Sequence, residues 1–206
     1  DLATLRDLPG VKAASLFSNI PLSGGGSSSG YQSRPGEVGP KETVPGNKYD
    51  VDEQALAALG VKLIAGRPFE AHEIQPPSET YEDSPQAIVT RAFAKELFPK
   101  DENFLGKTFY NGIGEPMTIV GVIEHMHGAW VGWDKLDNVV LFPRVKNGPT
   151  SVYLVRTEPG RRDATPPPPR GIILISIDAL RADSLGPYGS GRATTPFLDR
   201  LAARAT

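Results

Sequence analysis

The sequence has 206 residues, with 22 glycines, 20 prolines, no cysteine and a formal net charge of −2 at pH 7. The missing cysteines exclude disulfides and thiolate metal sites, and the near-neutral charge argues against nucleic acid or an anionic membrane surface as a partner. No apolar run approaches the ~20 residues that cross a bilayer, and the start has no signal-peptide pattern, so we expect an excised segment or a processed product.

The first quarter of the chain predicts a short helix, a strand and a long loop. Leucines recur every three residues from Leu2 to Leu8 and stop at Pro9, which is typical of a helix end. Residues 11–17 predict a strand. Residues 23–46 are rich in Gly, Ser and Pro, and they have too few apolar side chains to offset the entropy of ordering. We therefore expect an exposed, mobile loop there.

The second quarter predicts a capped helix, a strand and another loop. Asp52 is suited to cap a short helix, and Gly60 is suited to end it. Residues 61–65 predict a strand. Residues 71–85 are acidic and rich in proline, which favours a second loop.

The third part predicts more regular structure. The apolar residues 87–89 predict a short buried strand, which runs into an amphipathic helix over 91–98. Residues 107–123 are typical of a hairpin with its turn at Asn-Gly, and two strands follow at 138–142 and 151–157. This order of strands and helices predicts the α+β fold class.

The last forty residues have a different character. Four prolines at 166–169 form a stiff, extended spacer. The continuous β-branched run at 172–177 is typical of a central parallel strand that is buried on both faces. A polar loop and a helix at about 196–204 complete a strand–loop–helix tail of α/β type.

Several phrases of the first 162 residues occur in a characteristic order and spacing. They are Leu8-Pro9-Gly10-Val11 with Asn19-Ile20-Pro21-Leu22, Leu59-Gly60-Val61-Lys62-Leu63-Ile64-Ala65-Gly66-Arg67-Pro68-Phe69, Ala87-Ile88-Val89 with Leu97-Phe98-Pro99, Gly106-Lys107, and Ile119-Val120-Gly121-Val122-Ile123. This series resembles the MacB-like periplasmic core domain of MacB/FtsX-type ABC transporter permeases. The glycines have structural interpretations: Gly60 and Gly66 predict tight turns, and Gly121 predicts a bulge or a close backbone approach.

The resemblance implies a mixed sheet with a few helices, outside the cytoplasm and anchored to the membrane in the full-length protein. It implies no catalytic residues. The implied function is to bind partners or to relay ATP-driven conformational change in export or mechanotransmission. The implied partners are the transmembrane and ATPase parts of the same transporter, and a periplasmic adaptor or a second copy of the chain is a further candidate.

The tail resembles the opening of a sulfatase of the alkaline-phosphatase superfamily. The residues that carry this resemblance are Ile172 to Asp183, Tyr188-Gly189, Thr194-Thr195-Pro196 and Leu198 to Ala202. It implies that Asp178 binds a divalent metal such as calcium, although Ala179 stands where many sulfatases have a second Asp. The chain ends before the family's nucleophile motif. The alternative function is therefore the start of a metal-dependent sulfatase or phosphohydrolase, inactive in this length.

These resemblances divide the chain into three parts. They are an incomplete core domain at 1–162, a Pro-rich linker at 163–170 and a sulfatase-like fragment at 171–206. A natural gene fusion, a misjoined reading frame and a truncated chain all remain explanations for the junction. We expect the tail to be disordered or docked against the first domain, because an isolated strand and helix have little to pack on.

A pair of histidines is the other candidate metal site. His125 and His127 would project from the same face of a strand, but two imidazoles fall short of the three or four ligands that zinc requires. His72 is the only further candidate ligand, and it is distant in sequence. The favoured interpretation is therefore a solvated or loop-packing pair.

Three further features have plainer interpretations. Trp130 and Trp133 lie in a glycine-containing loop, where such aromatics more often anchor the loop on its own domain than form a binding patch. The acidic run at 79–83 predicts a solvated loop. The glycines at 24–26 do not form a phosphate loop, because the Gly-Lys pattern and the following helix are missing.

Overall fold

The computed structural model describes residues 2–36, 43–75, 85–145, 151–157 and 172–177. The strands are β1 (Val11–Phe17), β2 (Ser27–Gln32), β3 (Val44–Val51), β4 (Leu63–Gly66), β5 (Gln86–Thr90), β6 (Thr108–Asn111), β7 (Pro116–Ile123), β8 (Val139–Pro143), β9 (Ser151–Thr157) and β10 (Ile172–Ile177). The helices are α1 (Leu2–Arg6), α2 (Ala55–Leu59) and α3 (Arg91–Leu97), with one 3-10 turn, η2 (Ala71–Glu73). This mixed sheet with a few short helices confirms the predicted α+β class. Within the described ranges, no helix is long and apolar enough to cross a membrane.

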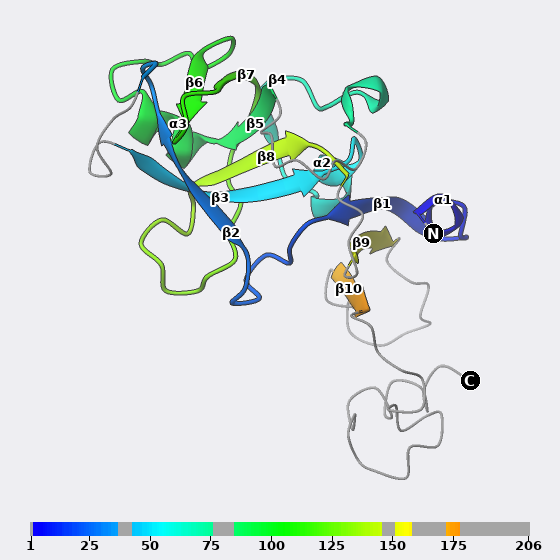
Figure 1. Cartoon of the computed structure of the whole chain (residues 1–206). Coiled ribbons are helices and arrows are strands. Elements are labelled where there is room, and N and C mark those ends of the chain that lie inside the picture. Colours follow the sequence, from blue (N-terminus) through cyan, green and yellow to red (C-terminus); the bar gives the residue numbers. More distant parts are fainter. Residues whose placement is uncertain (1, 37–42, 76–84, 146–150, 158–171, 178–206) are drawn as a thin grey trace.

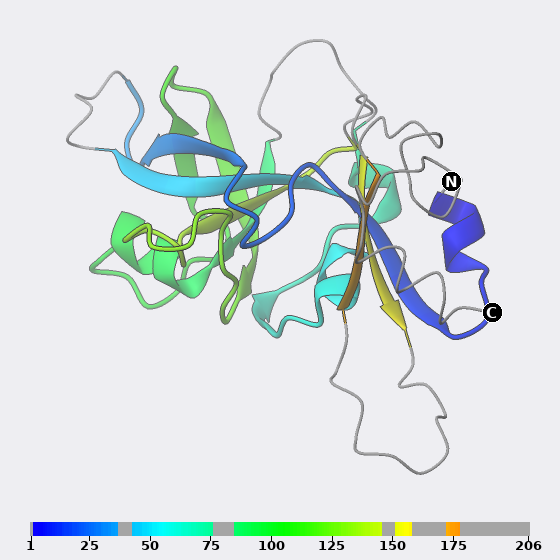
Figure 2. The ribbon, with the colours of Figure 1, turned by 90° about the horizontal axis from the view of Figure 1, so that it is seen from below.

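Six of the strands close into a ring (Figure 1). Its order is β3-β2-β6-β7-β5-β8, and β8 returns to pair with β3 in parallel, with Tyr49 opposite Leu141. From β3, the sheet continues through β1 to β9 and β10, which lie together at the other end of the molecule (Figure 2). β4 pairs in antiparallel register with the C-terminal end of β7.

The helix α3 fills one side of the ring with the face that its sequence predicts. Phe93, Ala94 and Leu97 are buried. The Phe93 ring meets the rings of Tyr31 and Phe109 edge-on, at centroid distances of 5.4 and 5.7 Å. These fully buried aromatic side chains join β2, β6 and α3 in one apolar cluster.

The helix α2 is secured at both ends by polar side chains. The Asp52 carboxylate accepts hydrogen bonds from the backbone N–H of Gln54 (2.9 Å) and of Leu16 (2.8 Å), so it joins the start of α2 to β1. Burial raises the pKa of Asp52. Gly60 ends the helix at φ 66°, as predicted, and Arg156 of β9 donates to its last two carbonyls at 3.1 and 2.7 Å.

The predicted loop at 23–46 is wrong for much of its length. β2 and the start of β3 lie within it and pair in antiparallel register, with Ser28 opposite Asn47. The polar side chains of β2 do not predict a strand. It forms because its backbone groups pair with β3 and β6, and because Tyr31 and Gln32 are buried against the ring.

The predicted central parallel strand at 172–177 also differs from the structure. β10 lies at the end of the sheet order and pairs with β9 in antiparallel register over its whole length, from Ile172 opposite Arg156 to Ile177 opposite Ser151. An apolar, β-branched run has strand propensity but does not specify its partner, and the open edge of β9 supplies one here.

The glycine predictions are confirmed. Gly66 has φ 76°, and a Cβ there would lie 2.1 Å from the Val120 carbonyl oxygen. Gly121 lies where the register of β5 and β7 shifts, and a Cβ there would lie 2.7 Å from the Arg67 carbonyl oxygen. Both residues allow the segment after β4 to pass close to the backbone of β7.

Arg67 begins that segment and pairs with Glu73 of η2. Its guanidinium donates to both carboxylate oxygens of Glu73, at 2.7 and 2.5 Å, and this bidentate pair lowers the pKa of Glu73 to about 2. Glu73→Gln should therefore remove a part of the stability that wild type has above pH 4.5 and loses as the pH falls towards 2. Urea unfolding between pH 2 and 7 measures this, and parallel pH profiles of the two proteins would contradict it.

Candidate functional site

The segment that joins β7 to β8, residues 124–138, gathers the polar and aromatic residues that the sequence singles out. We call it the β7–β8 loop. β7 ends at Ile123, where its apolar residues give way to Glu124. β8 begins at Val139, where apolar residues return. Gly128 donates its N–H to the Leu136 carbonyl oxygen at 2.7 Å, which brings the two ends of the loop together.

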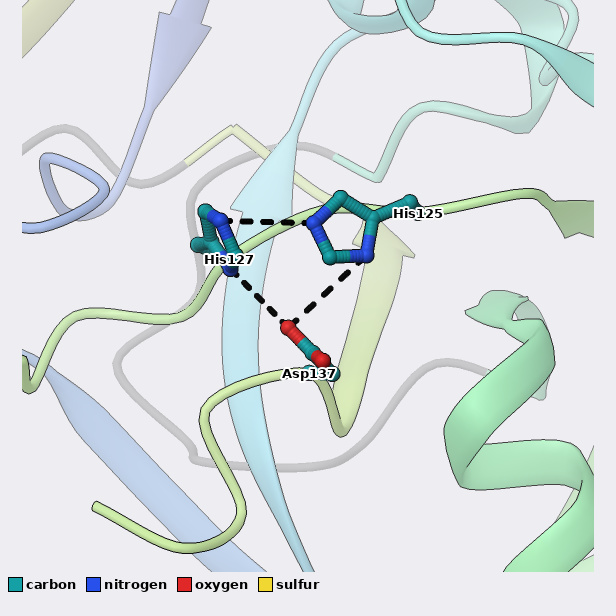
Figure 3. A group of neighbouring side chains, drawn as sticks. All are labelled: His125, His127 and Asp137. Atoms are coloured by element: carbon teal, nitrogen blue, oxygen red, sulfur yellow. Dashed lines mark hydrogen bonds and ion pairs between the residues drawn. The ribbon is translucent and has the colours of Figure 1, made fainter. Parts of the chain in front are cut away.

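His125, His127 and Asp137 meet at the base of this loop (Figure 3). The two Nε2 atoms lie 3.3 Å apart, and the rings are nearly perpendicular. Asp137 Oδ1 lies 2.9 Å from His127 Nδ1 and 3.8 Å from His125 Nδ1. All three side chains are about half exposed. In the described part of the chain, this is the one group of three His, Cys, Asp or Glu residues placed to share a metal ion.

Sequence reasoning missed Asp137 and misplaced the histidines. The two residues follow β7 and do not extend it, so strand alternation is not what brings them together. The third partner, Asp137, lies ten positions beyond His127 and two positions before the buried strand that begins at Val139. The sequence offered one signal for Asp137, an acidic residue next to the start of a predicted strand. Only the closure of the β7–β8 loop brings Asp137 next to the two histidines.

The tip of the β7–β8 loop is apolar. Val131 is 73 % exposed, and the partly buried Trp130 and Trp133 rings pack edge-on at a centroid distance of 5.5 Å. The glycine-rich segment before β2 supports the tip. Leu22 and Gly24 of that segment donate N–H groups to Gly128 and Ala129 at 2.9 and 2.8 Å. The tryptophans thus pack within their own domain while leaving part of each ring in contact with solvent.

The buried Asn47 of β3 holds the loop from below. Its Oδ1 accepts from the Ala129 N–H at 3.1 Å, and its Nδ2 donates to the carbonyls of Lys135 and Asn138 at 3.1 and 2.9 Å. A Cβ on Gly128 would lie only 2.0 Å from this amide. A single fully buried side chain therefore fixes the β7–β8 loop at three points.

Glu96 of α3 supports the far side of the loop. Its carboxylate accepts from Lys135 Nζ at 2.7 Å and from Asn138 Nδ2 at 2.9 Å. Partial burial by itself would raise the pKa of Glu96, but these two hydrogen bonds outweigh it and lower that pKa. Glu96 therefore stays ionised at neutral pH, and it ties α3 to the end of the loop.

The other sequence-predicted residues do not join this site. His72 is exposed on η2, where its Nδ1 lies 3.4 Å from Glu70. Asp178 and the acidic run at 79–83 lie outside the described residues. The predicted metal role of Asp178 and the three-part division of the chain stay predictions.

Comparison with known proteins gives one family and a set of structural neighbours. The family model described as "MacB-like periplasmic core domain" matches residues 1–166. No curated protein matches the sequence. The periplasmic region of MacB from Actinobacillus actinomycetemcomitans is 19% identical with a TM-score of 0.45, covering 69% of this chain and 52% of that one. The extracellular domain of the noncanonic ABC-type transporter YknZ from Gram-positive bacteria is 16% identical with a TM-score of 0.45, covering 69% and 59%.

The matches cover only part of each protein. This chain spans about half the length of the MacB periplasmic region that it matches. The family match ends at residue 166, and none of the comparisons supports the sulfatase-like resemblance of residues 171–206.

Proposed function

Because this chain belongs to the family of MacB-like periplasmic core domains, we propose that it is a non-catalytic module that binds a partner or relays conformational change in an ABC transporter. The domain belongs to the extracytoplasmic region of a transporter permease. The family match over most of the chain is the observation that carries the proposal. The transmembrane and ATPase parts of the same transporter are the partners that such a domain serves.

The architecture supports a passive mechanical role. Each strand of the closed ring is paired on both sides and α3 packs against it, so we expect the ring to move as a unit. The β7–β8 loop is held to this ring through Asn47 and Glu96. A force or a partner that acts on the loop would therefore be transmitted to β3 and α3.

The tip of the β7–β8 loop is the surface on which we place the partner contact. Val131, next to Trp130 in the chain, is 73 % exposed, and Leu22, whose N–H donates to Gly128, is 48 % exposed. Tryptophan is among the residues that contribute most to protein–protein interfaces. A protein partner such as an adaptor is the occupant that this apolar surface fits.

Site-specific labelling of the full-length transporter in native membranes tests the proposal. This chain has no cysteine, so in a full-length transporter whose other parts are made cysteine-free, Val131→Cys and the similarly exposed Ile113→Cys of the β6–β7 turn can carry the same bulky, membrane-impermeant maleimide. We expect both sites to label from outside. Only the label at Val131 should reduce partner-stimulated ATP hydrolysis, by about fivefold or more, a coupling of ~1–3 kcal/mol.

The control separates a contact from general disturbance. Equal loss of ATP hydrolysis with either label, or no loss with both, would contradict a partner contact at the tip. Absence of labelling from outside would contradict the extracytoplasmic role itself. Hydrodynamic analysis of the unlabelled chain distinguishes a second copy from a different partner, because only self-association depends on its own concentration.

A further inference from the structure

We propose that His125, His127 and Asp137 bind a zinc ion at the base of the β7–β8 loop. The sequence has three histidines and no cysteine, so imidazoles are the only nitrogen or sulfur side-chain ligands that favour zinc. Two of these three imidazoles lie within 3.3 Å of each other and share one carboxylate. Such a concentration of ligands on one loop is the observation that carries the proposal.

The distances fit a tetrahedral ion. With zinc–nitrogen bonds of about 2.0–2.1 Å, two ligand nitrogens of a tetrahedron lie about 3.3–3.4 Å apart. The Nε2 atoms of His125 and His127 lie 3.3 Å apart. One ligand atom from each of the three residues lies within 4.8 Å of the other two, so small rotations of exposed side chains suffice to close the site.

The hydrogen bond between Asp137 and His127 leaves Nε2 of His127 available to a metal ion. Asp137 Oδ1 accepts from His127 Nδ1 at 2.9 Å, and a proton held there leaves the lone pair on His127 Nε2 free for a metal. A carboxylate that orients a histidine in this way is a usual partner of a zinc ligand. Asp137 orients His127 in this way before the ion binds, and a carboxylate oxygen of Asp137 is then the third ligand.

The donor set selects the class of cation. Two neutral nitrogens and one carboxylate oxygen suit a borderline ion such as Zn²⁺, whereas Ca²⁺ and Mg²⁺ prefer a shell made of oxygen. Three protein ligands leave a fourth position for water. The half-exposed side chains give an ion direct access from solvent.

The backbone that carries the ligands is already fixed. Glu124, just before His125, donates its N–H to the Lys62 carbonyl oxygen at 2.9 Å. The Asp137 carbonyl oxygen accepts from the hydroxyl of Thr90, the N-cap of α3, at 2.6 Å. Binding an ion therefore requires side-chain adjustment alone, which keeps the entropic cost low.

The ion would connect the two ends of the β7–β8 loop. His127 and Asp137 enclose the nine-residue segment 128–136, which contains Val131, so zinc would restrict the motion of the tip. This consequence for partner binding rests on the proposed function, but binding of the ion does not. The two ideas can therefore fail separately.

Calorimetric titration of the untagged, chelator-treated 206-residue chain with ZnCl₂ tests the site. We expect one ion per chain. Affinity should fall about tenfold or more in His125→Ala, in His127→Ala and in Asp137→Asn. His72→Ala is the matched control, because it removes the only other histidine and should leave the affinity unchanged. Hydrogen exchange of residues 128–137 should slow on addition of zinc in wild type and in His72→Ala.

Circular dichroism without zinc verifies that each variant is folded, which we expect because the altered side chains are about half exposed. Should one histidine variant fail to fold, the other and Asp137→Asn still decide the outcome. Unchanged affinity in His127→Ala and Asp137→Asn would overturn the proposal. So would a stoichiometry of one ion per two chains, since it indicates a bridge between copies and no site within one.

Discussion

Replacing Arg144 with methionine is expected to lower the free energy of unfolding by about 3–5 kcal/mol, because it leaves a buried carboxylate without its partner. Arg144 follows β8, and Asp50 lies in the neighbouring β3. Two guanidinium nitrogens of Arg144, Nε and Nη2, lie 3.2 and 2.9 Å from Asp50 Oδ1. Both side chains are only 7 % exposed, so water cannot replace the lost hydrogen bonds.

A second variant isolates the cause of that loss. In Asp50→Leu with Arg144→Met, no unpaired charge remains, and the double variant should be more stable than Arg144→Met alone. Urea unfolding, with both the midpoint and its slope recorded, measures each value. A loss below about 1 kcal/mol in Arg144→Met would show that the ion pair does not hold β3 to β8.

Asn47→Ala is expected to cost about 1–3 kcal/mol, because it leaves the buried Ala129 N–H of the β7–β8 loop without its partner and removes a side-chain donor from two carbonyls. The Ala129 N–H donates to Asn47 Oδ1, whereas the Lys135 carbonyl also accepts from the Asn138 N–H at 3.0 Å and keeps that bond. Gly128→Ala should produce a similar loss, since its Cβ would occupy the space of the same amide. Hydrogen exchange should rise first over residues 128–138.

Asn103→Ala provides the matched control. This exposed asparagine also accepts from a backbone N–H, that of Leu105 at 3.1 Å, but solvent reaches both groups. Its loss should cost less than about 1 kcal/mol. Equal costs for Asn47→Ala and Asn103→Ala would contradict the role of Asn47 as the buried support of the loop.

The sequence predicts the apolar strands and α3 of this fold much better than it predicts β2. The apolar runs of β5, β8 and β9 and the amphipathic face of α3 identify those elements directly, because each must bury one pattern of side chains. β2 has no such pattern. Its serines and glycine take strand geometry because β3 and β6 pair with its backbone, which no local property of the segment encodes.

By itself, the sequence determined the α+β class, the family resemblance of the core domain, and the glycine turns at Gly60 and Gly66. The tertiary structure alone decided how the strands close into a ring, where β10 pairs, and that Asp137 reaches the two histidines. The reason is physical. Local periodicity reports what a segment buries, whereas its partners depend on backbone hydrogen bonds and loop closures between residues far apart in the chain.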